Sequence, residues 1–265
     1  MKIIPKKSLG QNFLIDNNLL ELIADLGEIN KEDIILEVGP GTGNLTEKLV
    51  HKKPEKIIAI EKDKNLCSKL KEKFYDEDKI KIINDSIMNI DEEKLINNKM
   101  IIYGNLPYNI SSQILVKWIK INNINKICKK MILMFQKEVA NRIIAFSNTK
   151  DYGRISILSS WKFRIKKIKD IKPSSFYPKP KVESTLLLFE PKDDFFKINN
   201  AENLEFITNT FFNQRRKMIK KPIRKIFKNN IEICNKLNLN ENYRPQNLTP
   251  DTYYKICREY ENLIN

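Results

Sequence analysis

Five short apolar runs, separated by amphipathic stretches, dominate the first half of the chain and constrain its fold. The runs are Ile34–Val38, Ile57–Ile60, Ile80–Ile83, Met100–Tyr103 and Met131–Phe135. They show no regular polar alternation, which is typical of parallel strands whose two faces are both covered. The segments between them have helical spacing, as in Leu45–Val50, Asn65–Phe74 and Ser111–Ile121. This alternation of strand and helix predicts a doubly wound α/β sheet.

Beyond residue 136 the sequence continues with two helical patterns and then two long strand patterns. We expect helices at Glu138–Phe146 and Arg154–Trp161, and strands at Phe163–Ile171 and Val182–Phe189. Three prolines and two serines exclude regular structure from the connection between the two strands, residues 172–180. The two strands are expected to add an antiparallel edge to the sheet.

The strand pattern stops at Pro191, and helical spacing takes over in Ala201–Lys228 and from Thr249 onward. Pro222 should break the first of these segments or begin a new helix. We therefore expect a domain of residues 1–190 that carries the sheet, followed by a small all-helical domain of residues 191–265.

The charge balance points to a polyanionic partner. Lys and Arg total 48 against 33 Asp and Glu in 265 residues, a formal net charge of +15. Such an excess is most often associated with nucleic acid, and an anionic membrane surface is the competing partner. A base composition that favours Lys, Asn and Ile codons would also raise the charge without any function. No apolar run approaches the roughly 18 residues of a membrane-spanning helix.

Cysteine and histidine usage excludes several kinds of site. The four cysteines (Cys67, Cys128, Cys234 and Cys257) are widely spaced and form no Cys-x-x-Cys pair. We therefore expect neither a metal site nor disulfides, but reduced thiols in the cytoplasm. The first residues lack the apolar core of a secretory signal. His51 is the only histidine, and its surroundings do not indicate a hydrolase.

Residues Ile34–Gly43 have the pattern of a strand that runs into a glycine turn and then a helix. Gly39, Gly41 and Gly43 let the backbone turn sharply and let a ligand approach the main chain. Their Gly-x-Gly-x-Gly spacing differs from the dinucleotide fingerprint, and no Gly-Lys-Ser/Thr phosphate loop is present. The acidic Glu37 before the turn fits S-adenosylmethionine, which carries a cationic amino-acid end and no pyrophosphate.

Two carboxylates follow at the ends of the next two strands. Glu61 ends the second strand, where it could accept both ribose hydroxyls of a cofactor, and Asp85 follows the third, where it could accept the adenine amino group. Ligands of open α/β sheets bind at these carboxyl ends. The alternative is that both residues are ordinary helix N-caps.

An amide, a proline and an aromatic ring follow the fourth strand, in the order Asn105, Leu106, Pro107 and Tyr108. The amide oxygen and nearby carbonyls could accept hydrogen bonds from an exocyclic amino group, while Tyr108 stacks on the base. The segment therefore favours a base-modifying enzyme. A loop in which Asn105 caps local structure and Tyr108 packs on the core remains the alternative.

Basic residues cluster in the helical part. Eight of them and no acidic residue lie between Phe211 and Lys228. The cluster comprises Arg215, Arg216, Lys217, Lys220, Lys221, Arg224, Lys225 and Lys228. We expect this face to contact RNA phosphates, with a solvated basic surface as the alternative. A second candidate patch comprises Lys162, Arg164, Lys166, Lys167 and Lys169.

Several motifs together resemble the ribosomal RNA adenine dimethyltransferase family, and most closely its bacterial 16S small-subunit branch. The matching segments are Lys7–Leu14, Glu37–Gly43, Asn105–Ser111, Gln136–Ala140, Tyr152–Arg154, Pro173–Phe176, Pro178–Val182 and Phe212–Lys217. The resemblance spans nearly the whole chain and is weakest around residues 229–247.

The resemblance implies a class I, Rossmann-like S-adenosylmethionine-dependent methyltransferase domain with a helical carboxyl-terminal domain that contacts RNA. It implies dimethylation of N6 on each of two adjacent adenosines near the 3′ end of 16S rRNA, within the small subunit or its precursor. The residues implied to line the cofactor are Asn12, Leu14, Gly39, Glu61, Asp85 and Asn105, and Gly41 belongs to the same turn. We expect a monomer that needs no metal and no membrane.

A mechanism follows from these residues. The Asn105 side-chain oxygen and the Leu106 or Pro107 carbonyl would accept the two N–H bonds of the target amine and direct its lone pair at the sulfonium methyl. Alignment of this kind can supply up to roughly 7–11 kcal/mol. Tyr108 and Phe176 would sandwich the base, with loop anchoring as the alternative for Phe176.

Two other functions compete with this interpretation. A 23S rRNA dimethylase that confers macrolide resistance shares the chemistry, but the Leu106-containing motif and the Gln136–Ala140 segment favour the small-subunit type. A non-enzymatic nucleic-acid-binding factor could retain the fold. The complete set of expected cofactor residues argues against that factor, and methyl transfer in vitro would distinguish the two.

Overall fold

The structure is a computed structural model that describes residues 5–6, 10–95, 98–228 and 230–264. Contacts within the chain divide it into two units. The first comprises Met1–Lys117, Asn123–Ala140 and Arg164–Pro191, and the second Trp118–Asn122, Asn141–Phe163 and Lys192–Asn265. The boundary expected at residue 190 stays a prediction.

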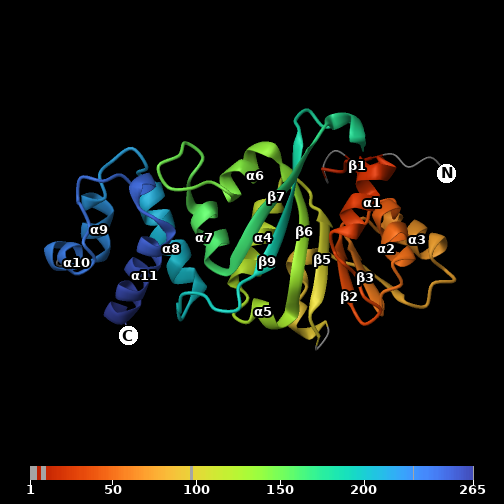
Figure 1. Ribbon diagram of the computed structural model, residues 1–265, viewed down its shortest axis with the longest axis horizontal. Coiled ribbons are helices and arrows are strands. Elements are labelled where there is room, and N and C mark those ends of the chain that lie inside the picture. Colours follow the sequence, from red (N-terminus) through yellow and green to blue (C-terminus); the bar gives the residue numbers. More distant parts are fainter. Residues whose placement is uncertain (1–4, 7–9, 96–97, 229, 265) are drawn as a thin grey trace. The chain divides into compact units, whose positions relative to one another are not determined.

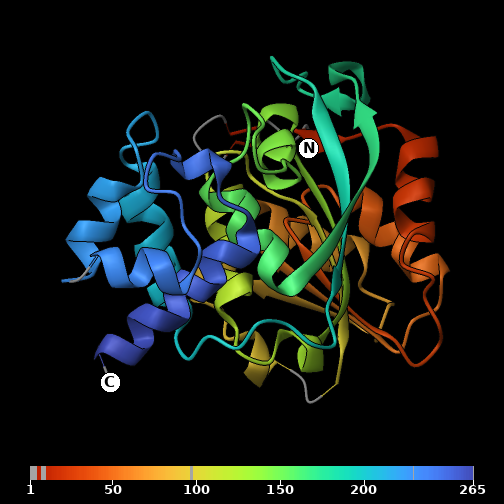
Figure 2. The same ribbon diagram turned by 60° about the vertical axis from the view of Figure 1, so that its left-hand side comes forward.

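A seven-stranded sheet forms the centre of the first unit, in the strand order β4-β3-β2-β5-β6-β9-β7 (Figure 1). Its strands are β2 (Ile34–Val38), β3 (Lys56–Glu61), β4 (Ile80–Asn84), β5 (Met100–Asn105), β6 (Cys128–Gln136), β7 (Phe163–Ile171) and β9 (Ser184–Pro191). The first five run parallel, and β9 pairs antiparallel with β6. The expected doubly wound sheet is confirmed, and Figure 2 shows the long strands β7 and β9 side by side at its edge.

The order of the strands reverses at β2, because the chain goes outward from β2 through β3 to β4 and then returns to β5 on the other side of β2. Ile35 therefore pairs with Ile57 on one side and with Ile101 on the other. Such a reversal leaves a crevice at the carboxyl ends of the two central strands, where ligands of this fold class bind.

Both faces of the central strands β2, β3, β5 and β6 are buried, as their uninterrupted apolar runs predict, whereas β4 is partly exposed. Ile35 and Leu36 point to opposite faces of β2, and both are fully buried. Helix α1 (Asn17–Asp25) contributes Leu20 and Ile23 to the cluster on the Ile35 face. The Asp16 carboxylate begins this helix by accepting a 3.1 Å hydrogen bond from the Leu19 N–H.

The remaining helices of the sheet region connect consecutive strands. They are α2 (Asn44–His51), α3 (Lys64–Lys73), α4 (Ser111–Lys120), α5 (Ile124–Ile127) and α6 (Lys137–Ile143). Helix α6 ends three residues before the expected end at Phe146. A separate two-stranded ribbon pairs β1 (Phe13–Leu14) with β8 (Phe176–Tyr177), antiparallel. The expectation that residues 172–180 lack regular structure was therefore wrong for β8, which gains its backbone partner from β1.

The second unit is helical, and α8 and α11 each pack on α7 and on each other. Its helices are α7 (Arg154–Lys162), α8 (Ala201–Phe212), α9 (Lys220–Ile226), α10 (Asn230–Lys236) and α11 (Pro250–Ile264). The buried Glu261 carboxylate holds the start of α8 by accepting hydrogen bonds from the Asn199 and Asn200 N–H groups, each 2.9 Å long. Pro222 lies in the first turn of α9, so it begins a helix as expected. None of the helices described is long and apolar enough to cross a membrane.

Candidate functional site

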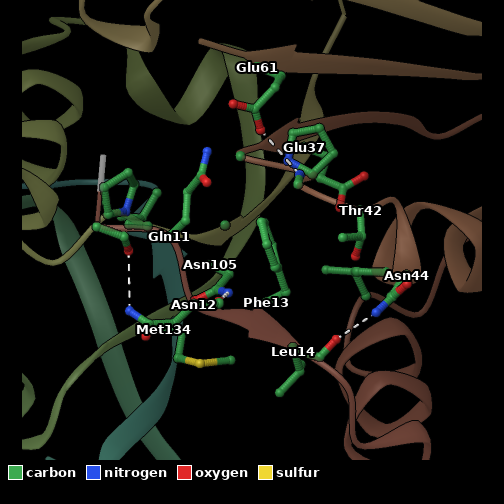
Figure 3. A pocket seen from close by; sticks show the side chains of 18 of the residues that line it. Gln11, Asn12, Phe13, Leu14, Glu37, Thr42, Asn44, Glu61, Asn105 and Met134 are labelled. Carbon is green, nitrogen blue, oxygen red and sulfur yellow. Dashed lines mark hydrogen bonds between the residues drawn. The ribbon is translucent and has the colours of Figure 1, made fainter. Parts of the chain in front are cut away.

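A pocket opens in the first unit at the carboxyl ends of β2, β3 and β5. Gly39 and Gly41 follow β2, Glu61 ends β3 and Asn105 ends β5, and all four line the pocket. Figure 3 shows the Glu61 and Asn105 side chains together with those of β1 around it. Gly39 and Asn105 are 66 positions apart in the sequence, and the strand order brings them together.

The glycine turn after β2 needs glycine because its backbone has positive φ angles. The φ angles of Gly39, Gly41 and Gly43 are 72°, 60° and 77°. A Cβ on Gly41 would lie only 2.8 Å from the ring of Phe13, a β1 residue that also lines the pocket. The turn is thus packed closely on β1, and its main chain remains accessible to a ligand.

Glu61 ties the glycine turn to the end of β3. Its Oε2 accepts a 3.1 Å hydrogen bond from the Gly41 N–H, and its Oε1 accepts one of 2.8 Å from the Asp63 N–H. Burial raises the pKa of Glu61, and these two N–H groups oppose the rise. Each carboxylate oxygen keeps a second lone pair for a hydroxyl donor of a ligand.

Glu37, on β2, is a buried carboxylate that lines the same pocket. It is 2% exposed, and its Oε2 finds no hydrogen-bond partner among the described residues. Burial raises the pKa of Glu37 to about 7. The neighbouring Thr46 lowers this pKa, although its hydroxyl does not reach hydrogen-bond geometry, and the charge of Glu61 raises it. A cationic ligand group would supply the partner that this oxygen lacks.

The Asn105 amide is held in a defined orientation by β1. Its Nδ2 donates a 2.8 Å hydrogen bond to the Asn12 carbonyl. The Asn105 side-chain oxygen has no partner in the described part of the chain and remains available as an acceptor. In the loop that follows, the Pro107 carbonyl accepts a 3.1 Å hydrogen bond from the Ile110 N–H. The Leu106 carbonyl is thus the less engaged of the two acceptors expected from the sequence.

Tyr108 completes the wall of the pocket on the β9 side. Its hydroxyl lies 2.6 Å from the Ser184 hydroxyl, so one of the two oxygens donates to the other. Burial raises the pKa of Tyr108 above its ordinary value, and the bond to Ser184 opposes the rise. The ring is half-buried and lines the pocket. A half-exposed ring fixed at its hydroxyl is suited to stacking on a flat ligand.

The structure places most, but not all, of the expected residues around this pocket. Those that line it are Asn12, Leu14, Gly39, Gly41, Glu61, Asn105, Leu106, Pro107 and Tyr108. Asp85 follows β4 at the same end of the sheet but is not among the described pocket residues. One oxygen of its carboxylate accepts hydrogen bonds from Ser86 and Asn89. Its role toward a cofactor stays a prediction.

Phe176, expected to stack on the base, also lies outside the pocket wall. Its side chain is 1% exposed and belongs to the core cluster that includes Leu14, its partner in the β1–β8 ribbon. The ring could cover a base only after moving toward the pocket, so the stacking role stays a prediction. Lys7, Ser8 and Leu9 of the amino-terminal motif lie outside the described residues.

Sequence reasoning did not single out several residues that line the pocket, among them Gln11, Asn44 and Met134. The Asn44 side chain donates a 2.8 Å hydrogen bond to the Leu14 carbonyl and so joins α2 to β1 (Figure 3). Met134 pairs with Asn105 between β5 and β6. The strand order, once predicted, could have identified Met134 as a neighbour of Asn105 and of the loop after β5.

The basic residues of the second unit differ in whether protein partners bind their side chains. Arg216, Lys217, Lys221 and Arg224 are exposed. The Arg215 guanidinium donates to the Lys150 carbonyl, and Lys220 forms a 3.3 Å ion pair with Glu241. These two partnered residues are less available to RNA than the other four, and the RNA contact itself stays a prediction.

One member of the second candidate patch was assigned wrongly. Lys162 is only 1% exposed, and its ammonium donates a 2.8 Å hydrogen bond to the Ile121 carbonyl. It also lies 4.3 Å from the centre of the Trp161 ring. Arg164, Lys166, Lys167 and Lys169 of β7 are exposed as expected. Across the described ranges, no group of three or more His, Cys, Asp or Glu residues could hold a metal ion.

The strand order, the glycine turn after β2 and the acidic residue that ends β3 define a class I S-adenosylmethionine-dependent methyltransferase. Comparisons with known sequences give the family. The model of the family described as ribosomal RNA adenine dimethylase matches residues 5–262. The chain belongs to the ribosomal RNA adenine dimethylase family, which confirms the resemblance found in its motifs.

Two curated relatives carry the name ribosomal RNA small subunit methyltransferase A. The one from Pelagibacter ubique (strain HTCC1062) is 53% identical over 263 residues, which are 99% of this chain and 99% of the relative. The one from Sulfurihydrogenibium sp. (strain YO3AOP1) is 37% identical and covers 98% of both chains.

Two solved structures resemble the whole chain. A dimethyladenosine transferase from Plasmodium falciparum superposes with a TM-score of 0.81 at 25% identity, covering 94% of this chain and 98% of that one. The 23S rRNA methyltransferase ErmE superposes with a TM-score of 0.69 at 20% identity, covering 94% of this chain and all of that one. The second likeness shows the shared fold alone.

Proposed function

We propose that the protein transfers methyl groups from S-adenosylmethionine to N6 of two adjacent adenosines near the 3′ end of 16S rRNA, two groups to each. The observation that carries this proposal is a single pocket lined by Glu61 and Gly41 on one side and by Asn105 and Tyr108 on another. A methyl donor and an amino acceptor must meet in one cleft, and this pocket brings a carboxylate suited to the donor together with an amide suited to the acceptor.

Support for the small subunit as the substrate comes from the relatives. Both carry a small-subunit name, and the one from Pelagibacter ubique is 53% identical along nearly the whole chain. We further propose that the protein acts in the cytoplasm, as a monomer, on 16S rRNA within the small subunit or its precursor. The four cysteines are free and buried, in keeping with a reducing compartment.

The residues of the pocket fit S-adenosylmethionine. In this proposal the ribose hydroxyls donate to Glu61, and the amino-acid ammonium pairs with the otherwise unpartnered Glu37 oxygen. Gly39 leaves the main chain open beside them, and Asn12 and Leu14 supply the opposite wall. When bound, the cofactor supplies an electrophilic methyl group on a positively charged sulfur. Asp85 is the proposed acceptor for its adenine amino group.

The loop after β5 would orient the target adenine. An adenine amino group is a weak nucleophile, because its lone pair is conjugated with the ring. If the Asn105 side-chain oxygen and the Leu106 carbonyl accept its two N–H bonds, the nitrogen is drawn toward a pyramidal geometry and its lone pair becomes available. The bond from Asn105 Nδ2 to Asn12 keeps the oxygen in place for this task. No strong base is needed, because the amine becomes acidic as the new bond forms.

Tyr108 would hold the plane of the base. Stacking of a base on an aromatic ring contributes about 1–3 kcal/mol. The hydrogen bond between the Tyr108 and Ser184 hydroxyls restrains the ring, so little side-chain freedom is lost when the base binds. Arg216, Lys217, Lys221 and Arg224 would contact phosphates elsewhere on the RNA, with Arg215 and Lys220 held partly by their protein partners.

The proposal is tested by incubating the protein and labelled cofactor with undermethylated 30S and 50S particles, followed by mass spectrometric mapping of the label. The expected result is N6,N6-dimethyladenosine at two neighbouring positions near the 3′ end of 16S rRNA. Label on 23S rRNA would instead indicate the large-subunit activity. Absence of transfer to either particle would refute the proposal.

Two variants assign the roles within the pocket. Tyr108→Ala should reduce turnover on rRNA while leaving the affinity for the cofactor nearly unchanged, because the ring contacts only the base. Asn105→Ala should reduce both the turnover on rRNA and the affinity for the cofactor, because its amide is proposed to face both ligands. Tyr75→Ala, at a tyrosine that is 84% exposed, serves as the control for loss of an aromatic residue. A Tyr108→Ala enzyme with an unchanged rate at saturating rRNA would exclude the stacking role.

A further inference from the structure

An exposed aromatic ring lies next to the wall of the pocket and has no role in the site described above. Tyr177, on β8, is 54% exposed. Its hydroxyl makes no hydrogen bond within the part of the chain that the structure describes. Large aromatic side chains usually bury their rings, so an exposed ring beside a ligand site suggests a contact surface.

The β1–β8 ribbon places Tyr177 directly beside the pocket. Tyr177 pairs with Phe13, and Phe176 pairs with Leu14. Paired residues of an antiparallel ribbon point to the same face, with their Cα atoms about 4.5–5.5 Å apart. Phe13 is the residue that packs on Gly41 and lines the pocket. Tyr177 therefore lies on the same face of the ribbon as Phe13, one strand farther from the pocket.

The opposite face of the ribbon anchors it. Leu14 and Phe176 are both part of the buried core cluster. The Ser175 hydroxyl donates a 3.1 Å hydrogen bond to the Asp16 carboxylate, and the Ile15 N–H donates one of 2.9 Å to the Ser175 carbonyl. The backbone that carries Tyr177 is thus fixed to the start of α1, so a ligand that meets the ring finds it already positioned.

Basic residues flank Tyr177 in the sequence. Lys172, Lys179 and Lys181 lie within five residues of Tyr177 and are exposed. None of these three lysines forms an ion pair with a carboxylate in the described ranges. Glu183, the next acidic residue along the chain, is occupied by a 2.6 Å ion pair with Lys137. An exposed ring in a segment rich in exposed, unpaired lysines suits a single-stranded nucleotide, which offers a flat base and a phosphate.

We propose that Tyr177, together with Lys172, Lys179 and Lys181, binds the nucleotide that adjoins the adenosine in the pocket. This inference rests on the proposed function. A base that enters the pocket leaves its neighbour without a stacking partner, and the Tyr177 ring replaces that partner one strand spacing away. The lysines hold the phosphates on either side. For a substrate with two adjacent adenosines, the second adenosine stacks on Tyr177 while the first reacts.

The test measures methyl transfer to undermethylated 30S particles, with KM and kcat determined separately. Tyr177→Ala should raise KM for the particle about 5- to 150-fold, the range expected for loss of one base–aromatic stack. Tyr177→Phe should behave like the natural protein, because the hydroxyl has no partner to lose. Tyr177→Leu keeps an apolar side chain without an aromatic face and should resemble Tyr177→Ala.

Three controls separate stacking from folding and from charge. The melting temperature and the dissociation constant for S-adenosylmethionine should be unchanged in all three Tyr177 variants. Tyr75→Ala should leave KM unchanged. Replacing Lys179 and Lys181 together by Gln should weaken binding of the particle. The salt dependence of binding should then correspond to about one to two fewer released counterions.

The outcomes distinguish this inference from the function on which it rests. A natural enzyme that dimethylates 16S rRNA, with a Tyr177→Ala variant of equal KM, overturns the inference and leaves the proposed function intact. A Tyr177→Leu variant that retains the natural KM also overturns it, because an apolar contact would then suffice. A natural enzyme that modifies neither particle overturns both.

Discussion

Glu37→Gln should stabilise the free protein and weaken its hold on the cofactor. Burial raises the pKa of Glu37 from 4.5 to about 7 in the folded chain. Between these two values the folded state keeps a proton that the unfolded state releases, so stability falls as pH rises through this window. This shift in pKa corresponds to a loss of about 3 kcal/mol of folding stability. The loss is complete above pH 7 and absent below pH 4.5.

Glutamine has nearly the same shape and no charge to bury. The variant should therefore unfold with a free energy about 3 kcal/mol higher than the natural protein above pH 7, and with little difference at pH 4.5. Urea unfolding monitored by circular dichroism across this range measures both values. The affinity for S-adenosylmethionine should fall in the same variant, because the cofactor ammonium loses its anionic partner.

The matched control is Glu47→Gln on α2. The Glu47 carboxylate is half exposed and forms a 2.8 Å ion pair with Lys73. Removing an exposed pair should change stability by no more than about 1 kcal/mol. The reasoning about Glu37 is refuted if Glu37→Gln shows the same dependence of stability on pH as the natural protein, or if it binds the cofactor as tightly.

Three further substitutions test other parts of the account. Gly41→Ala should lower the melting temperature and weaken cofactor binding, because its Cβ would lie 2.8 Å from the Phe13 ring and its φ is 60°; normal binding of the cofactor by a folded variant would contradict this. Ser184→Ala should raise KM for rRNA without changing cofactor affinity, because the Tyr108 hydroxyl loses its partner; an unchanged KM would show that the ring needs no restraint. Burial lowers the pKa of Lys162 from 10.5 to about 8, so between these pH values the unfolded chain binds a proton that the folded chain does not. The stability of the natural protein should therefore rise with pH in this window, and Lys162→Met should remove the rise. Unfolding at pH values on either side of 8 measures this rise, and its persistence in the variant would assign it to another group.

Local periodicity predicted the central parallel strands because both of their faces are buried, although the same apolar pattern in β4 belongs to a strand that is partly exposed. β2 and β5 needed no tertiary information, since a run such as Ile34–Val38 has few other stable environments. β1 and β8 could not be predicted in this way. Each has two residues, and their pairing joins positions 13–14 to 176–177. A ribbon this short is stabilised by its contacts with the core, which no window of sequence contains.

The positions of site residues could be predicted where a strand end determines them. Glu61 and Asn105 end their strands, so the predicted sheet already placed them at one edge. The orientation of side chains could not be predicted. Phe176 and Tyr177 are neighbours in sequence, yet the first is buried and the second exposed, because alternate residues of a ribbon face opposite ways. Lys162 shows the same limit, since a lysine pattern does not reveal that one member is turned into the core.

The central claim is that one cleft binds both the methyl donor and the target adenine. Titration calorimetry with a bisubstrate analogue, in which the N6 of an adenosine is joined by a short linker to the methyl-bearing position of an otherwise complete cofactor, tests this claim most directly. The analogue should bind more tightly than either half, because one binding event then engages two neighbouring subsites. Both Glu61→Gln and Asn105→Ala should weaken it. Affinity no greater than that of the cofactor half, or insensitivity to Asn105→Ala, would place the adenine elsewhere and contradict the account.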